Sequence, residues 1–285
     1  MIAVTGATGQ LGRFVINALL KKVPASEIIA AVRNPEKAHD LAVLGVQIRK
    51  ADYSQPATLD TAFQGVDKLL LISSSEVGQR IAQHSAVIAA AKRAGVKLLA
   101  YTSLLHADKS PLGLGEEHRA TEALLRESGL PVVLLRNGWY TENYAASIAP
   151  ALAHGAFIGA VAEGRIASAA REDYAEAAAV VLTQGNQAGK VYELAGDDIY
   201  TLAEFSAEIA RQSGKPVVYH DLSEADFKQA LLGAGLPDVF ASLLADSDAG
   251  AAKGGLFDDS HTLSKLIGRP TTPYADVIAA TLATR

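Results

Sequence analysis

Short apolar runs alternate with longer amphipathic segments through the first half of the chain. The runs have the length and composition of buried strands, and we predict strands at Ile2–Thr5, Ile28–Val32, Val46–Lys50, Lys68–Ile72, Lys97–Thr102 and Val132–Leu135. Between them, apolar residues at helical spacing predict helices at Gln10–Lys22, Gln79–Ala94 and Glu117–Ser128. This alternation predicts the α/β class: a doubly wound parallel sheet with right-handed crossovers.

The alternation breaks after Leu135, where a segment rich in alanine and glycine begins. Further along, the pattern predicts a helix near Asp173–Thr183, a strand at Val191–Leu194, a helix at Leu202–Ser213, a strand at Pro216–Tyr219 and a last helix at Tyr274–Ala283. We therefore predict a Rossmann domain over residues 1–137, completed by about 170–195. Residues 138–169 and 196–285 are expected to form a smaller C-terminal lobe that carries the substrate.

Charge and hydropathy narrow the range of partners. Lys and Arg number 26 against 31 Asp and Glu, and the net charge is −5 with no basic run, so no nucleic-acid partner is expected. One long uncharged stretch, residues 145–162, contains Pro150, Gly155 and Gly159, so no membrane insertion is expected. The apolar start lacks a basic segment before it, and we expect a cytoplasmic protein.

Reactive side chains are sparse. The chain has no cysteine, which excludes disulfides, thiolate metal sites and a cysteine nucleophile. Its seven histidines form no His-x-x-x-His pair, and no Gly-x-Ser-x-Gly segment occurs. We therefore expect no metal cofactor and no serine hydrolase chemistry.

Three glycines lie in the turn between the first strand and the first helix, in the segment Thr5-Gly6-Ala7-Thr8-Gly9-Gln10-Leu11-Gly12. The first permits a tight turn, the second lets backbone N–H groups approach a pyrophosphate, and the third lets helix and strand pack closely. The helix N-terminus adds a partial positive charge that favours phosphate. Because the turn joins a strand to a helix, we predict a dinucleotide site at Gly6, Ala7, Thr8, Gly9, Gln10, Leu11 and Gly12.

An arginine stands where the second strand ends, in Ala31-Val32-Arg33-Asn34. Proteins that bind NAD place an Asp or Glu at this point to receive the ribose hydroxyls. A guanidinium instead holds a 2′-phosphate through paired, charge-assisted hydrogen bonds. We therefore predict NADP(H) as the cofactor, with a solvated loop arginine as the alternative.

Polar residues also follow the third and fourth strands, at the sheet edge where open α/β sheets bind ligands. Asp52 is placed to flank the adenine, and Ser73, Ser74 and Ser75 are placed to meet the cofactor ribose. Asp and Ser are common turn residues as well, which is the alternative for both groups.

Longer motifs resemble a known family. The glycine turn, Arg33 and residues 136–143 (Arg-Asn-Gly-Trp-Tyr-Thr-Glu-Asn) resemble the NmrA-like branch of the short-chain dehydrogenase/reductase superfamily. Within that branch the chain is similar to bacterial flavin-free NAD(P)H:quinone oxidoreductases, with triphenylmethane-dye reductases as near relatives. The resemblance includes residues 69–75, 101–103 and 253–259. It implies an NADP-binding Rossmann domain, a small C-terminal lobe, a cleft between them and a homodimer.

One departure from the superfamily concerns the proton donor. The usual motif is Tyr-x-x-x-Lys, but none of the nine tyrosines has a lysine four residues later. By the resemblance, the position that the motif's lysine takes in the superfamily falls near His118 in this chain. The catalytic residues therefore stay unknown, with His118 and Tyr101 as candidates; a histidine on a helix among acids is also typical of a protein surface.

The missing acid favours acceptors that delocalise charge. Hydride addition to a ketone gives a strongly basic alkoxide, whereas addition to a quinone gives a phenolate with a pKa of about 10, which water can protonate. We predict hydride transfer from NADPH directly to a quinone, without flavin, because only one phosphate fingerprint is visible. The alternatives are reduction of cationic dyes or other conjugated acceptors, and a non-catalytic regulator that senses NADP(H).

Aromatic and amide side chains follow the sixth strand. Asn137, Gly138, Trp139 and Tyr140 are expected beside the nicotinamide. Tyr140, Asn143 and Tyr144 are expected to hold the substrate, because aromatic faces stack a flat ring and amides orient carbonyl oxygens. The alternative is that these aromatic rings pack the lobe against the sheet.

Overall fold

Seven strands form one sheet in the order β3-β2-β1-β4-β5-β6-β8 in the computed structural model, which describes residues 1–284. The pairings from β3 through to β6 are parallel. The order reverses between β1 and β4, and such a switch point creates the crevice in which doubly wound sheets bind ligands. The predicted α/β class is confirmed. The strands are β1 (Ile2–Thr5), β2 (Ile28–Val32), β3 (Gln47–Lys50), β4 (Lys68–Leu71), β5 (Leu98–Leu104), β6 (Val132–Asn137) and β8 (Val191–Leu194).

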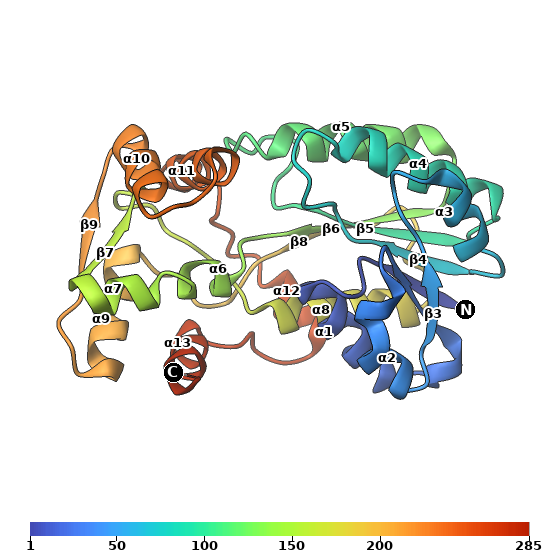
Figure 1. Cartoon of the computed structure of the whole chain (residues 1–285), viewed down its shortest axis with the longest axis horizontal. Coiled ribbons are helices and arrows are strands. Elements are labelled where there is room, and N and C mark those ends of the chain that lie inside the picture. Colours follow the sequence, from blue (N-terminus) through green and yellow to red (C-terminus); the bar gives the residue numbers. More distant parts are fainter. Residues whose placement is uncertain (285) are drawn as a thin grey trace. The chain divides into compact units, whose positions relative to one another are not determined.

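Helices cover both faces of this sheet, with α3, α4 and α5 on one face and α1 and α8 on the other (Figure 1). Their bounds are α1 (Gln10–Leu20), α2 (His39–Val43), α3 (Pro56–Ala62), α4 (Arg80–Arg93), α5 (Gly115–Ser128) and α8 (Arg171–Thr183), with short 3₁₀ turns at η1 (Ala25–Glu27) and η2 (Pro35–Ala38). The sequence pattern missed α2 and α3 because five to seven residues make too few turns to show a helical period.

The chain divides into two compact units. The first comprises residues 1–104, 116–137 and 171–192, and the second comprises 105–115, 138–170 and 193–284. The second unit holds a two-stranded parallel sheet of β7 (Ala156–Gly159) and β9 (Val218–Asp221). Its helices are α6 (Thr141–Ala145), α7 (Ile148–His154), α9 (Leu202–Ser213), α10 (Glu224–Gly233), α11 (Asp238–Ala252), α12 (Thr262–Ile267) and α13 (Tyr274–Ala283).

Four strands differ from the sequence prediction by more than one residue: β7 was missed, β5 and β6 each end two residues later than predicted, and β9 lies two residues further along the chain. Strand β7 was not predicted, since its sequence Ala-Phe-Ile-Gly is short and lies in a segment rich in alanine and glycine. Strand β5 continues to Leu104, two residues beyond its predicted end, because Ser103 and Leu104 pair with Arg136 and Asn137 of β6. Within residues 1–284, no helix combines the length and apolar character needed to cross a membrane.

Candidate functional site

The turn between β1 and α1 has a backbone that only glycine fits. Gly6 has φ +60°, and a Cβ on Gly12 would lie 2.4 Å from the Gly6 carbonyl oxygen and 2.7 Å from the Ala7 Cα. The Gly9 N–H donates to the Gly6 carbonyl at 2.9 Å, which closes the turn. Gly9 precedes α1 and offers no side chain to its first-turn N–H groups, and that first turn carries no acidic residue. This cradle therefore suits a bound phosphate.

A cavity of about 330 Å³ opens beside this turn in the first unit. It brings together most of the residues predicted to bind the cofactor: Gly6, Thr8, Gly9, Gln10, Leu11, Gly12, Arg33, Asp52, Ser73, Ser74 and Ser75. Ala7 is buried beneath the turn and does not line the cavity. The residues come from the carboxyl ends of four neighbouring strands, which is where the strand order predicted a ligand.

Side chains from three elements hold the loop that follows β4. The backbone N–H groups of three successive residues, 72 to 74, donate in turn to Thr5 Oγ1 at 3.0 Å, Thr102 Oγ1 at 2.9 Å and His84 Nε2 at 3.0 Å. The Ser74 carbonyl accepts from Arg80 Nε at 2.6 Å. The loop backbone is thereby fixed from behind. No sequence pattern predicted these supporting contacts, because a lone Thr or His within a helix or strand carries no signal of its own.

The protonation state of His84 follows from these contacts. Because Nε2 accepts the Ser74 N–H, the ring proton lies on Nδ1, 2.9 Å from Thr121 Oγ1. Burial and the nearby Arg80 guanidinium lower the pKa of His84 to about 4. A neutral imidazole therefore supports the loop at neutral pH.

Asp52 lies just after the carboxyl end of β3, where hydrogen bonds hold its side chain as a carboxylate. Its Oδ1 accepts from the Ser54 hydroxyl at 2.6 Å and the Ser54 N–H at 3.0 Å, and its Oδ2 accepts from Gln55 Nε2 at 3.0 Å. The hydrogen bonds from Ser54 lower the pKa of Asp52, and the Arg33 charge adds to this effect. An ionised, oriented carboxylate suits an amino group on a bound ring.

Arg33 is exposed at the cavity rim, next to two further cavity residues, Glu76 and Gln83, that were not predicted from the sequence. Glu76 Oε1 accepts from Arg33 Nη1 at 2.7 Å, and Glu76 Oε2 accepts from Gln83 Nε2 at 2.7 Å. Glu76 directly follows Ser75 in the chain, but an acid after a turn of serines carries no signal of its own.

His118 does not lie on the surface, so that interpretation was wrong. The residue is 4% exposed, and its Nδ1 lies 2.7 Å from the Tyr101 hydroxyl. Burial lowers the pKa of His118 to about 3 and raises the pKa of Tyr101. The helix places His118 on the face of α5 that packs inward, which the neighbouring acids in the sequence concealed. Neither residue lines the cavity, so their catalytic role stays a prediction.

The residues predicted beside the nicotinamide and the substrate do not line this cavity. Asn137 ends β6 and is buried, and its Oδ1 has no hydrogen-bond partner within residues 1–284. Gly138, Trp139, Tyr140, Asn143 and Tyr144 belong to the second unit. Their roles toward cofactor and substrate stay predictions.

Two of these aromatic side chains, Trp139 and Tyr144, form part of the second unit's core. The ring centroids of Trp139 and Tyr144 lie 6.4 Å apart, and those of Tyr144 and Phe205 lie 6.1 Å apart. Both Trp139 and Tyr144 are 7% exposed. This arrangement favours a packing role within the second unit for both.

Asp248 is a buried acid beneath this aromatic core. Its carboxyl accepts from the Tyr144 hydroxyl at 3.2 Å and the Ala160 N–H at 3.0 Å, and burial raises its pKa to about 6. The pKa of Asp248 is higher in the folded than in the unfolded protein. The protonated carboxyl therefore adds to the free energy of unfolding at low pH, and this contribution is lost as the pH rises through about 6.

We expect Asp248→Asn to raise the free energy of unfolding by about 1–3 kcal/mol at pH 7.5 and to change it little at pH 4, because the amide keeps the size without the buried charge. Urea denaturation at both pH values measures this. The exposed Asp259→Asn is the control. A stability loss at pH 7.5 would show that the carboxylate is needed there.

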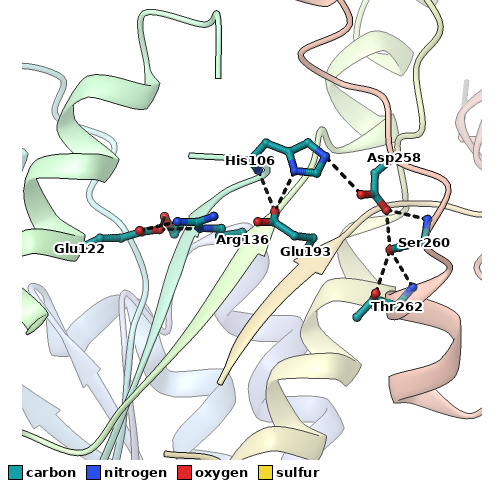
Figure 2. A network of polar contacts seen from close by, with 8 residues as sticks. His106, Glu122, Arg136, Glu193, Asp258, Ser260 and Thr262 are labelled. Carbon is teal, nitrogen blue, oxygen red and sulfur yellow. Dashed lines mark hydrogen bonds and ion pairs between the residues drawn. The ribbon is translucent and has the colours of Figure 1, made fainter. Parts of the chain in front are cut away.

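Two further sets of polar side chains, none of them lining the cavity, form ion pairs and hydrogen bonds (Figure 2). In the first unit, the buried Arg136 forms a bidentate pair with Glu122 at 2.8 and 2.9 Å. In the second unit, the His106 N–H donates to Glu193 at 2.7 Å, and His106 Nε2 lies 3.2 Å from an Asp258 oxygen. Within residues 1–284, no cluster of His, Asp and Glu is arranged to hold a metal ion.

The reversed strand order, the glycine cradle and the cavity at the strand ends together define a dinucleotide-binding protein of the α/β class. The chain belongs to the NmrA-like family, whose sequence model matches residues 1–265. It is 63% identical to quinone oxidoreductase 2 of Escherichia coli K12, over 98% of each chain.

Solved structures give the same result. The E. coli NADPH-dependent quinone oxidoreductase complexed with NADPH has a TM-score of 0.97 at 62% identity, covering 99% of this chain and 100% of that one. The Citrobacter sp. triphenylmethane reductase complexed with NADP(H) has a TM-score of 0.94 at 41% identity, covering 99% of this chain and 100% of that one. The resemblance inferred from the sequence motifs is confirmed.

Proposed function

We propose that this protein is an NADPH-dependent oxidoreductase that passes hydride directly to a quinone, without flavin. The observation that carries the proposal is the cavity that joins the glycine cradle to Arg33. This cavity lies in a chain 63% identical, along nearly its whole length, to a quinone oxidoreductase.

The cavity residues divide the binding of NADPH among them. The backbone N–H groups of Gln10 to Gly12 would hold the pyrophosphate, and Arg33 would pair with the 2′-phosphate. Asp52 would orient the adenine side, and Ser73, Ser74 and Ser75 would meet the ribose from a fixed loop. When bound, NADPH supplies the hydride.

On the substrate side we retain the residues that the sequence motifs suggested. Asn137, Gly138, Trp139 and Tyr140 are proposed to meet the nicotinamide, and Tyr140, Asn143 and Tyr144 to hold the acceptor ring. For Tyr144 the buried position favours an indirect role through packing. We also propose a cytoplasmic homodimer, on the family resemblance alone.

Turnover with quinones tests the function. The purified, colourless protein is expected to oxidise NADPH, followed at 340 nm, with simple quinones and no added flavin. A requirement for FMN or FAD would refute direct transfer. Binding of NADPH without turnover on quinones, triphenylmethane dyes or azo compounds would instead favour a regulator.

The proton that completes quinone reduction is expected to come from water. His118 is neutral at physiological pH because burial lowers its pKa to about 3, and Tyr101 is held as a phenol by a raised pKa. We expect His118→Ala and Tyr101→Phe each to retain kcat within about tenfold, because water supplies the proton and neither side chain acts as the general acid. A general acid that was needed would contribute 10²–10⁴-fold. A loss beyond about a hundredfold, with folding and NADPH affinity intact, would identify a required acid.

A further inference from the structure

The Glu76 carboxylate forms an ion pair with the guanidinium of Arg33, the same group that the proposed function assigns to the 2′-phosphate. Glu76 pairs with Arg33 at 2.7 Å, and both side chains line the cofactor cavity. Glu76 and Arg33 lie 43 residues apart in the chain and meet because the loops after β2 and β4 reach the same sheet edge.

We propose that Glu76 sets cofactor selectivity by competing with the 2′-phosphate of NADPH for Arg33. This inference rests on the proposed function, because it requires NADPH in this cavity. Carboxylate and phosphate oxygens both match the paired N–H groups of a guanidinium. A ribose hydroxyl carries no charge, so NADH leaves the pair of Arg33 and Glu76 intact. Glu76 therefore lowers the affinity for NADPH and not that for NADH.

The surroundings of Glu76 keep its carboxylate in place. Its backbone N–H donates to the Ser74 hydroxyl at 3.1 Å, and the Ser74 backbone is held by His84 and Arg80. On the other side, Gln83 Nε2 donates to Glu76 Oε2 at 2.7 Å. The buried Gln83 Oε1 has no hydrogen-bond partner within residues 1–284, so this amide is oriented by Glu76.

The pair is nevertheless weak enough for a phosphate to displace. The Arg33 and Glu76 side chains are 72% and 46% exposed, and ion pairs that face water contribute little. A dianionic phosphate attracts the guanidinium more strongly than one carboxylate does. The competition should therefore reduce NADPH affinity without abolishing it.

Direct binding measurements test this proposal. We expect Glu76→Gln to tighten NADPH binding by about three- to tenfold and to change NADH binding less than about twofold, measured by isothermal titration calorimetry. In an Arg33→Ala background, Glu76→Gln should alter the NADPH Kd by less than about twofold. Asp60→Asn is the matched control, because Asp60 forms a similar exposed pair with Arg93 away from the cavity.

The outcomes separate this proposal from the function on which it rests. Equal tightening of NADPH and NADH, no change in either, or the same gain without Arg33 would each overturn the role of Glu76 while the wild type still binds NADPH. A wild type that binds no NADPH would overturn the proposed function itself.

Discussion

Gly12→Ala is expected to weaken NADPH binding by at least about 100-fold, which makes it the largest single effect foreseen for this protein. The added Cβ would lie 2.4 Å from the Gly6 carbonyl oxygen and 2.7 Å from the Ala7 Cα. Both are backbone atoms, so relief requires a shift of the turn itself. Such a shift removes two or more charge-assisted hydrogen bonds to the pyrophosphate, each contributing about 1.5–3 kcal/mol.

Calorimetric titration with NADPH measures this loss, and thermal denaturation tests whether the variant folds. Gly185→Ala is the matched control, because a Cβ at Gly185 meets nothing within 4 Å and Gly185 does not line the cavity. The same substitution of glycine by alanine should leave binding unchanged there. Unchanged NADPH affinity in a folded Gly12→Ala protein would place the pyrophosphate away from this turn.

Arg33→Ala is expected to weaken NADPH binding by roughly 10- to 150-fold and to leave NADH binding nearly unchanged, because one charge-assisted pair contributes about 1.5–3 kcal/mol. Arg33 is well placed for this role: its side chain is 72% exposed at the cavity rim and already holds an anionic group, the Glu76 carboxylate. The effect should shrink as salt is added, since an exposed charge pair is screened.

The matched control for this variant is Arg93→Ala, which removes an exposed arginine that pairs with Asp60 and does not line the cavity. Dissociation constants for NADPH and NADH are compared in the three proteins at low and moderate salt. An equal loss for both cofactors in Arg33→Ala would remove Arg33 from the phosphate site.

Much of the first half of the fold could be predicted because its signals are local. Strands β1, β2 and β4 and the start of α1 lie where the apolar runs and the glycine turn placed them, since four or five apolar residues next to a glycine turn suffice to define them. The roles expected for Gly6 and Gly12 are likewise local, because both concern the backbone of one turn. The missed elements α2, α3 and β7 are short, and tertiary packing stabilises them more than their own pattern does.

Burial and pairing across the chain lay beyond the sequence pattern. His118 lies among charged residues in the chain, yet it is buried beside Tyr101 because its helix turns that side inward. Trp139 and Tyr144 were predicted to stack against a bound ring. In the structure their own rings pack into the core of the second unit, which favours a packing role. Such outcomes depend on which helix face meets which neighbour, and short-range periodicity does not specify it.

The sequence by itself determined the α/β class and the glycine turn, and it predicted Arg33 as the partner of a 2′-phosphate, because each depends on residue types within a few positions of one another. Only the tertiary structure decided that Thr5, Thr102 and His84 support one loop and that Glu76 reaches Arg33. These contacts join residues 10 to 67 positions apart. They exist because parallel strands bring their carboxyl ends to one edge, and the hydrogen bonds formed there depend on the packed geometry of the whole sheet.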